Sequence, residues 1–216
     1  MNKPTSRADL IAALAASSTP VRRTRGWEGA ALIIAATAAA AIGASGVFRL
    51  WSGILTGAAS PYFWMTNGLL LVLGAASTTA LVAGALPQVG PRSSAPAWTF
   101  AMLGVLPLAA VIELLVPHGQ LHAGLKDPHA LHCLSSALAA GLVVAIAAVL
   151  FLRRAAPVAL ARQGWLTGLA SGALGALAFG ITCPLDGIVH LGLWHVLPVP
   201  IAALVARVVV PPLIRW

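Results

Sequence analysis

The residues best suited to bind a metal ion or to undergo thiol chemistry fall in two short stretches of this sequence. The first stretch holds His118, His122, Asp127, His129, His132 and Cys133. The second holds Cys183, Asp186, His190 and His195, and the two together contain every histidine and cysteine of the chain. Thiolate, imidazole and carboxylate groups are the ligands that zinc and related divalent ions take in proteins. The two stretches therefore predict a metal site or a redox-active cysteine pair.

The spacing in the first stretch is that of one helix face. Asp127 followed by Pro128 is typical of a helix N-terminus, with the aspartate as the N-cap. His129, His132 and Cys133 then lie at i, i+3 and i+4, so they share a face. Because a helix N-terminus lowers the pKa of a nearby thiol, we expect Cys133 to be the more reactive cysteine.

The second stretch predicts another helix start. Asp186 and Gly187 mark that start, and His190 then lies one turn after Asp186. No paired C-x-x-C motif of a structural zinc site is present. Two simpler interpretations stay open, namely histidines that only form hydrogen bonds at a membrane surface and cysteines that are small buried apolar side chains. The candidate sensing or redox residues are Cys133 and Cys183, and the candidate metal ligands are Cys133, Cys183, His132, His190, His195 and Asp186.

The composition places these residues in a membrane protein. Apolar residues make up 59% of the 216 residues and charged residues 8%, and the mean hydropathy is +0.92. A soluble domain carries about a quarter charged residues, so the composition excludes a soluble enzyme and a disordered chain. Six apolar stretches are long enough to cross about 30 Å of hydrocarbon as helices. They are residues 27–48, 62–86, 98–116, 131–152, 165–181 and 188–210.

The distribution of lysine and arginine predicts how these stretches are oriented, because the more basic side of a membrane protein faces the cytoplasm. One side holds Lys3, Arg7, Arg22, Arg23, Arg25, Arg92, Arg153, Arg154, Arg162, Arg207 and Arg215, and the other holds Arg49 and Lys126. We therefore predict an all-α polytopic membrane protein with six transmembrane helices and both termini in the cytoplasm. This topology accounts for the net charge of +8 without nucleic acid. It also places both cysteines on the extracytoplasmic side, which permits disulfides.

The chain divides into a cytoplasmic arm, residues 1–26, and a six-helix bundle, residues 27–216. Ser6 and Asp9 resemble the capping box of a short helix, on which Leu10, Ile11 and Leu14 share a face. A helix of about 11 residues is marginal alone, so we expect it to be ordered against a partner or a membrane surface. The alternative is a basic tail that sets the topology and rests on anionic lipid. The candidate partner-binding residues are Leu10, Ile11, Leu14, Val21 and Arg22.

A stripe of small residues runs along the fifth apolar stretch. It consists of Gly164, Gly168, Gly172, Ala176 and Gly180, and it predicts close helix packing. A transport path instead needs ionisable residues or broken helices near the membrane midplane, and Glu113 lies nearer the outer end of its stretch. A small transporter or channel, for example one for a metal ion, remains one alternative. A membrane thiol oxidoreductase remains another, although it lacks a C-x-x-C motif.

Two segments of the sequence resemble the NrsF family of six-span anti-sigma factors, and the resemblance extends over nearly the whole chain. The segments are DLIAALAASSTPVRR, residues 9–23, and CPLDGIVHLGLWHVLPV, residues 183–199. The resemblance implies an inner-membrane protein that holds an extracytoplasmic-function sigma factor at the membrane and releases it under heavy-metal or oxidative stress. By position, the two cysteines of that response are Cys133 and Cys183.

The same resemblance sets expectations for activity and partners. It implies a regulator without enzyme activity. It implies no constitutive cofactor, but a transient heavy-metal ion at the cysteine pair fits the response. The expected partners are the sigma factor on the cytoplasmic side and the lipid bilayer, with no direct contact to nucleic acid.

Overall fold

The structure is a computed structural model that describes residues 6–17, 24–86, 94–115, 127–155 and 157–215. Within these ranges the chain is helical and contains no strand, as the all-α prediction requires. Val21, Arg22, His118 and His122, which the sequence analysis named, lie outside the described residues.

The helices of the described residues follow one another with short connections. In chain order they are α1 (Arg7–Ser17), α2 (Gly26–Phe48), α3 (Ser52–Thr56), α4 (Pro61–Ala85), α5 (Ala95–Leu103), α6 (Val105–Leu115), α8 (Ala130–Ala155), α9 (Leu160–Gly180), α10 (Ile188–His190), the π-helical turn η1 (Leu191–His195) and α11 (Pro198–Ile214).

Each predicted apolar stretch is helical in the structure. The first, second, fourth and fifth stretches correspond to α2, α4, α8 and α9. The third stretch is divided into α5 and α6 at Gly104, because Pro107 has no N–H to donate to the carbonyl of Leu103. The sixth stretch is divided into α10, η1 and α11, with Pro198 in the first turn of α11, where a missing N–H costs no helical hydrogen bond.

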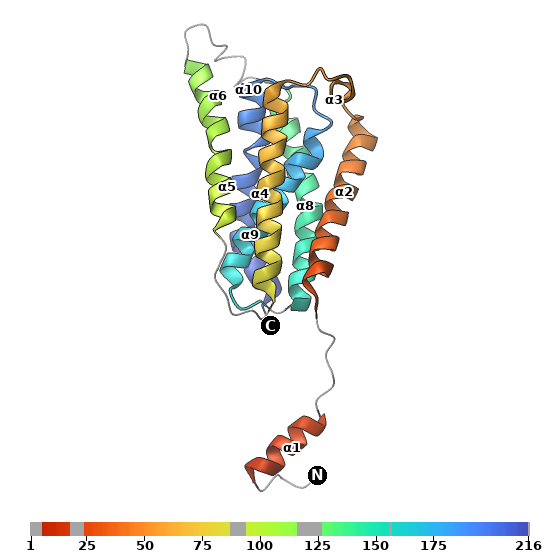
Figure 1. Ribbon diagram of the computed structural model, residues 1–216, viewed down its shortest axis with the longest axis vertical. Coiled ribbons are helices and arrows are strands. Elements are labelled where there is room, and N and C mark those ends of the chain that lie inside the picture. The colour runs from red at the N-terminus through yellow and green to blue at the C-terminus, as the bar shows by residue number, and fades with distance from the viewer. Residues whose placement is uncertain (1–5, 18–23, 87–93, 116–126, 156, 216) are drawn as a thin grey trace.

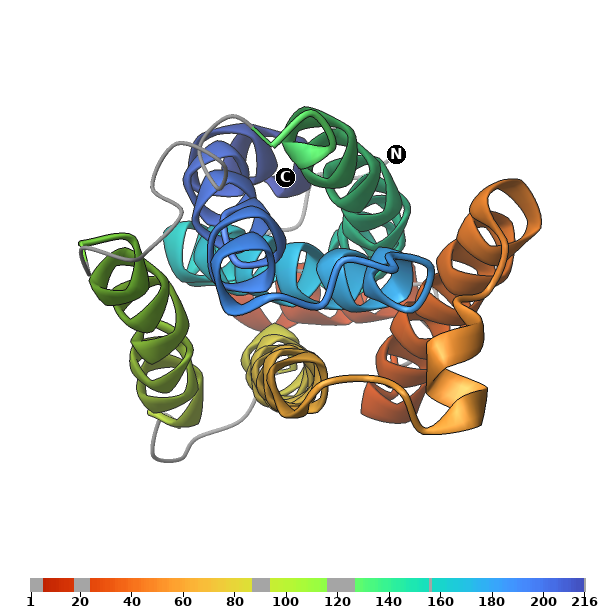
Figure 2. The ribbon, with the colours of Figure 1, turned by 90° about the horizontal axis from the view of Figure 1, so that it is seen from above.

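The long helices lie side by side in one bundle (Figure 1), and the view from above shows α9 in its interior (Figure 2). Five segments among the described residues are long and apolar enough to cross a membrane: α2, α4, α5 with α6, α8, and α10 through α11. α9 is not among them, since it carries five glycines together with Arg162 and Gln163. It packs instead against α4, α8 and α11, which bury nearly its whole length.

Close approach of backbones explains the small residues on α9. A Cβ atom on Gly168 would lie 2.4 Å from the Cα of Ala203 in α11, and one on Gly175 would lie 2.3 Å from the backbone nitrogen of Gly141 in α8. Neither site has room for a larger side chain. The predicted packing stripe is therefore confirmed at Gly168, and Gly164 and Gly172 also face the backbone of α11.

The two ends of the bundle differ in their ionisable residues. The basic end, defined here by Arg25, Arg153, Arg154, Arg162 and Arg215, lies where α2 and α9 begin and where α8 and α11 end. The opposite end, called the thiol end, is defined by Cys133, Cys183, His190 and His195. The C-terminus lies at the basic end (Figure 1).

Helix α1 forms as the sequence predicts but packs against no described part of the bundle. The Asp9 N–H donates to the Ser6 hydroxyl at 3.1 Å, and the Ser6 N–H donates to the Asp9 carboxylate at 3.1 Å, which confirms the capping box. No residue of α1 is buried. Leu10, Ile11 and Leu14 are 46%, 67% and 60% exposed, so the helix presents an uncovered apolar face.

Candidate metal centre

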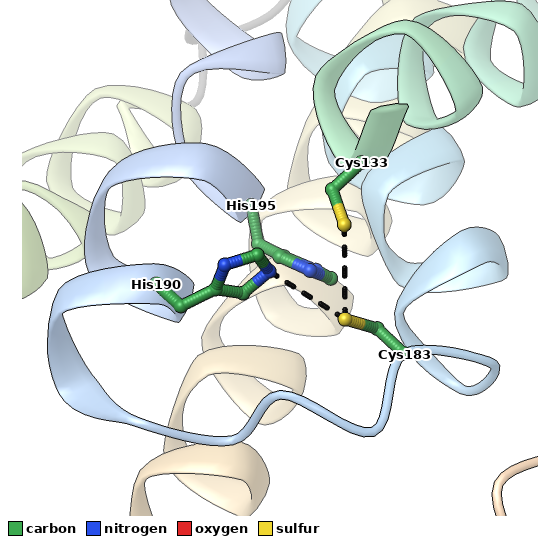
Figure 3. A group of neighbouring side chains, drawn as sticks. All are labelled: Cys133, Cys183, His190 and His195. Carbon is green, nitrogen blue, oxygen red and sulfur yellow. Dashed lines mark hydrogen bonds between the residues drawn. The ribbon is translucent and has the colours of Figure 1, made fainter. Parts of the chain in front are cut away.

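Four buried side chains converge at the thiol end: Cys133, Cys183, His190 and His195 (Figure 3). Each offers one ligand atom, and these atoms all lie within 4.8 Å of one another. The sulfurs of Cys133 and Cys183 are 3.8 Å apart, and the Cys183 sulfur lies 3.5 Å from Nε2 of His190. Both cysteines are free thiols. The group can therefore bind a metal ion.

Three separate segments supply the four side chains. Cys133 lies in the first turn of α8, and Cys183 follows the end of α9. Hydrogen bonds fix the chain at that point, because the Cys183 N–H donates to the Gly180 carbonyl at 3.2 Å and the Thr182 hydroxyl donates to the Phe179 carbonyl at 2.7 Å. The two histidines come from α10 and η1.

The π-helical turn brings the two histidines together. In a regular α-helix of 3.6 residues per turn, side chains five residues apart point about 140° away from each other. The i to i+5 repeat of a π-helix stacks such residues on one side. His190 and His195 accordingly have ring centroids 5.3 Å apart. Single π turns occur frequently at functional sites, and this one serves to align two candidate ligands.

Asp127 extends the group by one hydrogen bond. Its Oδ2 atom lies 2.5 Å from Nδ1 of His190, and its Oδ1 atom accepts the N–H of His129 at 2.8 Å. The N-cap role predicted for Asp127 is thus present, but its second oxygen orients a histidine 63 residues away. Burial raises the pKa of the Asp127 carboxyl, but the His129 N–H and His190 lower it more, so the pKa lies below its usual range.

The groups around Cys183 act on the acidity of its thiol. Contact with the Cys133 thiol lowers the pKa of Cys183, burial raises it, and the hydrogen bond with His190 lowers it further, so the pKa lies well below its usual range. The sequence did not predict the hydrogen bond between Cys183 and His190. That Cys133 is the more reactive cysteine stays a prediction.

His195 is the most deeply buried of the described histidines, with 1% of its surface exposed. Neither of its ring nitrogens has a hydrogen-bond partner among the described residues. Its ring stacks on Phe179, with centroids 6.0 Å apart. Because buried polar atoms in proteins nearly always have a partner, these nitrogens call for a bound ion, a proton donor or water.

The remaining candidate ligands lie elsewhere. His132 is exposed and packs edge-on against Phe48, with ring centroids 5.0 Å apart. The Asp186 carboxylate accepts the Ser60 N–H at 2.8 Å, and the Asp186 carbonyl accepts the Ser60 hydroxyl at 2.8 Å. Asp186 therefore ties the start of α4 to the segment after α9 and does not join the group. Glu113 is exposed on α6.

Comparison with known proteins gives one match. The family model described as "NrsF: Negative regulator of sigma F" matches residues 14–216. The match begins at Leu14, so Leu10 and Ile11 precede it. No curated protein matches the chain, and no solved structure matches it.

Proposed function

Because the chain belongs to the NrsF family of negative regulators of a sigma factor, we propose that it is a membrane-bound anti-sigma factor. It sequesters an extracytoplasmic-function sigma factor at the inner face of the bacterial inner membrane. Heavy-metal or oxidative stress at Cys133 and Cys183 releases that factor. The observation that carries the proposal, beyond the family match, is that the thiol end and α1 lie at opposite ends of the molecule (Figure 1).

The proposed topology has six crossings with both termini in the cytoplasm. The segregation of the described arginines supports it, with Arg49 alone at the thiol end. The position of α9 supports it as well, because a helix wrapped by α4, α8 and α11 needs no lipid-facing apolar surface. Reporter fusions at Val158, which is 97% exposed, should show a cytoplasmic location, whereas fusions between residues 117 and 126 should show a periplasmic one. A periplasmic signal at Val158 contradicts the six-span count.

The arm supplies the binding surface in this proposal, through Leu10, Ile11, Leu14, Val21 and Arg22. The first three form the uncovered apolar face of α1. An amphipathic helix that lies in a groove of its partner buries such anchors, and each contributes about 1.5–3 kcal/mol. Two aspartates on this face are therefore enough to prevent binding.

A physical route connects the two ends. α8 begins beside Cys133 and ends at Ala155, and the carbonyl of Arg154 near its end accepts the Thr24 hydroxyl at 3.0 Å. Thr24 lies in the last part of the arm, two residues before α2 begins. A shift of α8 caused by an event at Cys133 thus reaches the residue that anchors the arm. Converting a mostly bound partner into a mostly free one takes about 5 kcal/mol of differential interaction, which is less than the binding free energy of a typical structural zinc site.

Pull-down from gently solubilised membranes, followed by mass spectrometry, tests the proposal. The wild-type chain should retain one sigma factor, and the double variant Leu10→Asp with Leu14→Asp should lose it while remaining in the membrane. Ala12→Asp with Ala16→Asp is the matched control, because it adds the same charges to the opposite face of α1. Retention by the Leu10 and Leu14 variant excludes this face as the binding element, and a wild-type chain that retains no sigma factor overturns the proposed function.

A further inference from the structure

We propose that Cys133, Cys183, His190 and His195 form a closed tetrahedral site for one d10 divalent cation, Zn²⁺ or Cd²⁺, and that Asp127 orients His190 within it. The inference rests on the proposed function, because it names the ligand set through which the thiol end responds to metals. It assigns a role to the two histidines and to the aspartate, in addition to the cysteines.

Two distances between ligand atoms match those of a tetrahedron around zinc. With Zn–S bonds of about 2.3 Å and Zn–N bonds of about 2.0–2.1 Å, tetrahedral geometry places two sulfurs about 3.8 Å apart and a sulfur and a nitrogen about 3.6 Å apart. The two sulfurs are 3.8 Å apart, and Cys183 Sγ lies 3.5 Å from His190 Nε2. The Cys183 sulfur therefore already lies at coordination distances from the Cys133 sulfur and from His190 Nε2, and all four ligand atoms lie within 4.8 Å of one another.

The fourth ligand is the buried imidazole without a partner. His195 is 1% exposed, and neither ring nitrogen is hydrogen-bonded to a described residue. One nitrogen of this ring belongs to the group of ligand atoms that lie within 4.8 Å of one another. An ion bound by His195 satisfies a polar atom that otherwise stays unpaired in the interior of the bundle.

Asp127 supplies the outer partner that metal-binding histidines usually have. Its carboxylate accepts the Nδ1–H of His190, so Nε2 carries the lone pair and faces Cys183. Histidine ligands of zinc commonly donate the other ring N–H to a carboxylate, and loss of such a partner weakens metal binding about 10–100-fold. In this arrangement the ion takes two thiolates and two neutral imidazoles, and the two thiol protons pass to solvent.

The ligand set also determines the class of ion and the kind of site. Two thiolates with two imidazoles favour zinc and cadmium over magnesium and calcium, which take oxygen ligands. All four side chains are buried, and four protein ligands leave no open position for substrate or water, which is the arrangement of structural zinc sites. An ion bound there joins the start of α8, the end of α9 and the π-helical turn.

Cobalt substitution of the purified full-length chain tests this site, because tetrahedral Co²⁺ with thiolate ligands absorbs strongly in the visible range. One Co²⁺ per chain with that spectrum, displaced by Zn²⁺ or Cd²⁺, is the expected result. Bound Zn²⁺ should also protect both cysteines from alkylation in the wild-type chain. A weak octahedral spectrum, or cysteines that react equally fast with and without zinc, overturns the proposal.

Variants locate the ligands. Cys133→Ser and His195→Ala should each abolish the tetrahedral spectrum, and Asp127→Asn should weaken Co²⁺ binding about 10–100-fold. His132→Ala is the matched control, because this exposed histidine precedes Cys133 and lies outside the group. An unchanged spectrum in His195→Ala excludes that ligand. Sigma-factor capture by the same preparations separates the two proposals, since failure to bind cobalt with intact capture overturns the metal site alone, and failure of capture with intact cobalt binding overturns the anti-sigma function alone.

Discussion

The thiol end and the basic end of this protein are built in opposite ways. At the thiol end, four buried side chains from three segments meet around one point, and an aspartate holds one of them in place. At the basic end, arginines are distributed over the helix termini, and α1 beyond them buries none of its residues. In the proposed function, the chemistry that depends on atomic distances lies inside the bundle, and partner binding is assigned to a helix whose apolar face is uncovered.

The largest effect should follow from removing both thiols of the thiol end. Cys133→Ser with Cys183→Ser should abolish induction by cadmium and leave basal repression intact, because α1 is untouched. A sigma-dependent reporter with and without cadmium measures this, and His132→Ala should respond like the wild type. Normal induction in the double serine variant places the sensing function elsewhere in the chain.

The next largest effect should come from the contact that holds α8 and α9 together. A valine at Gly175 meets the backbone of Gly141, so Gly175→Val should destabilise the bundle by about 1–3 kcal/mol or more. Thermal unfolding in detergent, followed by size-exclusion chromatography, measures the loss. Gly43→Val is the control, because a Cβ at Gly43 in α2 has no neighbouring atom within 4 Å. Equal stability of the two variants contradicts the packing derived for α9.

A smaller effect separates the two aspartates of the thiol end. Asp186→Asn removes a charged acceptor from the Ser60 N–H and should lower stability by about 1 kcal/mol, while Co²⁺ affinity stays unchanged. Asp127→Asn should instead lower Co²⁺ affinity and leave stability nearly unchanged. Thermal unfolding and cobalt titration of both variants measure the contrast. Loss of cobalt binding in Asp186→Asn shows that Asp186 belongs to the metal group after all.

The smallest effect tests the connection between the two ends. Thr24→Ala removes the hydrogen bond to the Arg154 carbonyl, which contributes about 1 kcal/mol, so the cadmium concentration needed for half-maximal induction should shift up to about 5-fold. Thr24→Ser keeps the hydroxyl and should behave like the wild type. Induction curves from the sigma-dependent reporter measure the shift, and identical curves for Thr24→Ala and wild type indicate that this bond does not couple the ends.

Local patterns in the sequence predicted the helices and the capping box well. Hydropathy alone located α2 to within one residue at its N-terminus, and Ser6 with Asp9 marked the start of α1. These features depend on neighbours along the chain, which a sequence shows directly. Gly168 was likewise predictable, because a four-residue repeat of small side chains has a direct packing meaning in a membrane helix.

The arrangement of the thiol end was less accessible, because it depends on departures from regular helix geometry and on distant contacts. A regular helix separates His190 from His195, and only the π turn aligns them. The sequence predicts Asp127 as an N-cap. Its contact with His190 joins residues that are 63 positions apart, so local patterns do not show it. The sequence predicts Asp186 as a metal ligand one turn before His190, but in the structure its carboxylate accepts the Ser60 N–H. The spacing in the sequence identified residues that could bind a metal ion, but it did not show which of them belong to the site.

The burial of α9 has a consequence for how the protein is made. A membrane helix normally leaves the translocon because its own apolar surface partitions into lipid. α9 has little such surface to offer, and its glycines, together with Arg162 and Gln163, lower that tendency further. On the proposed topology, α9 depends on α4 and α8, which precede it, and on α11, which follows it, to stay in the bilayer. On that topology we expect insertion of this helix to be cooperative, so nascent chains that end before α11 should hold α9 in the bilayer less stably.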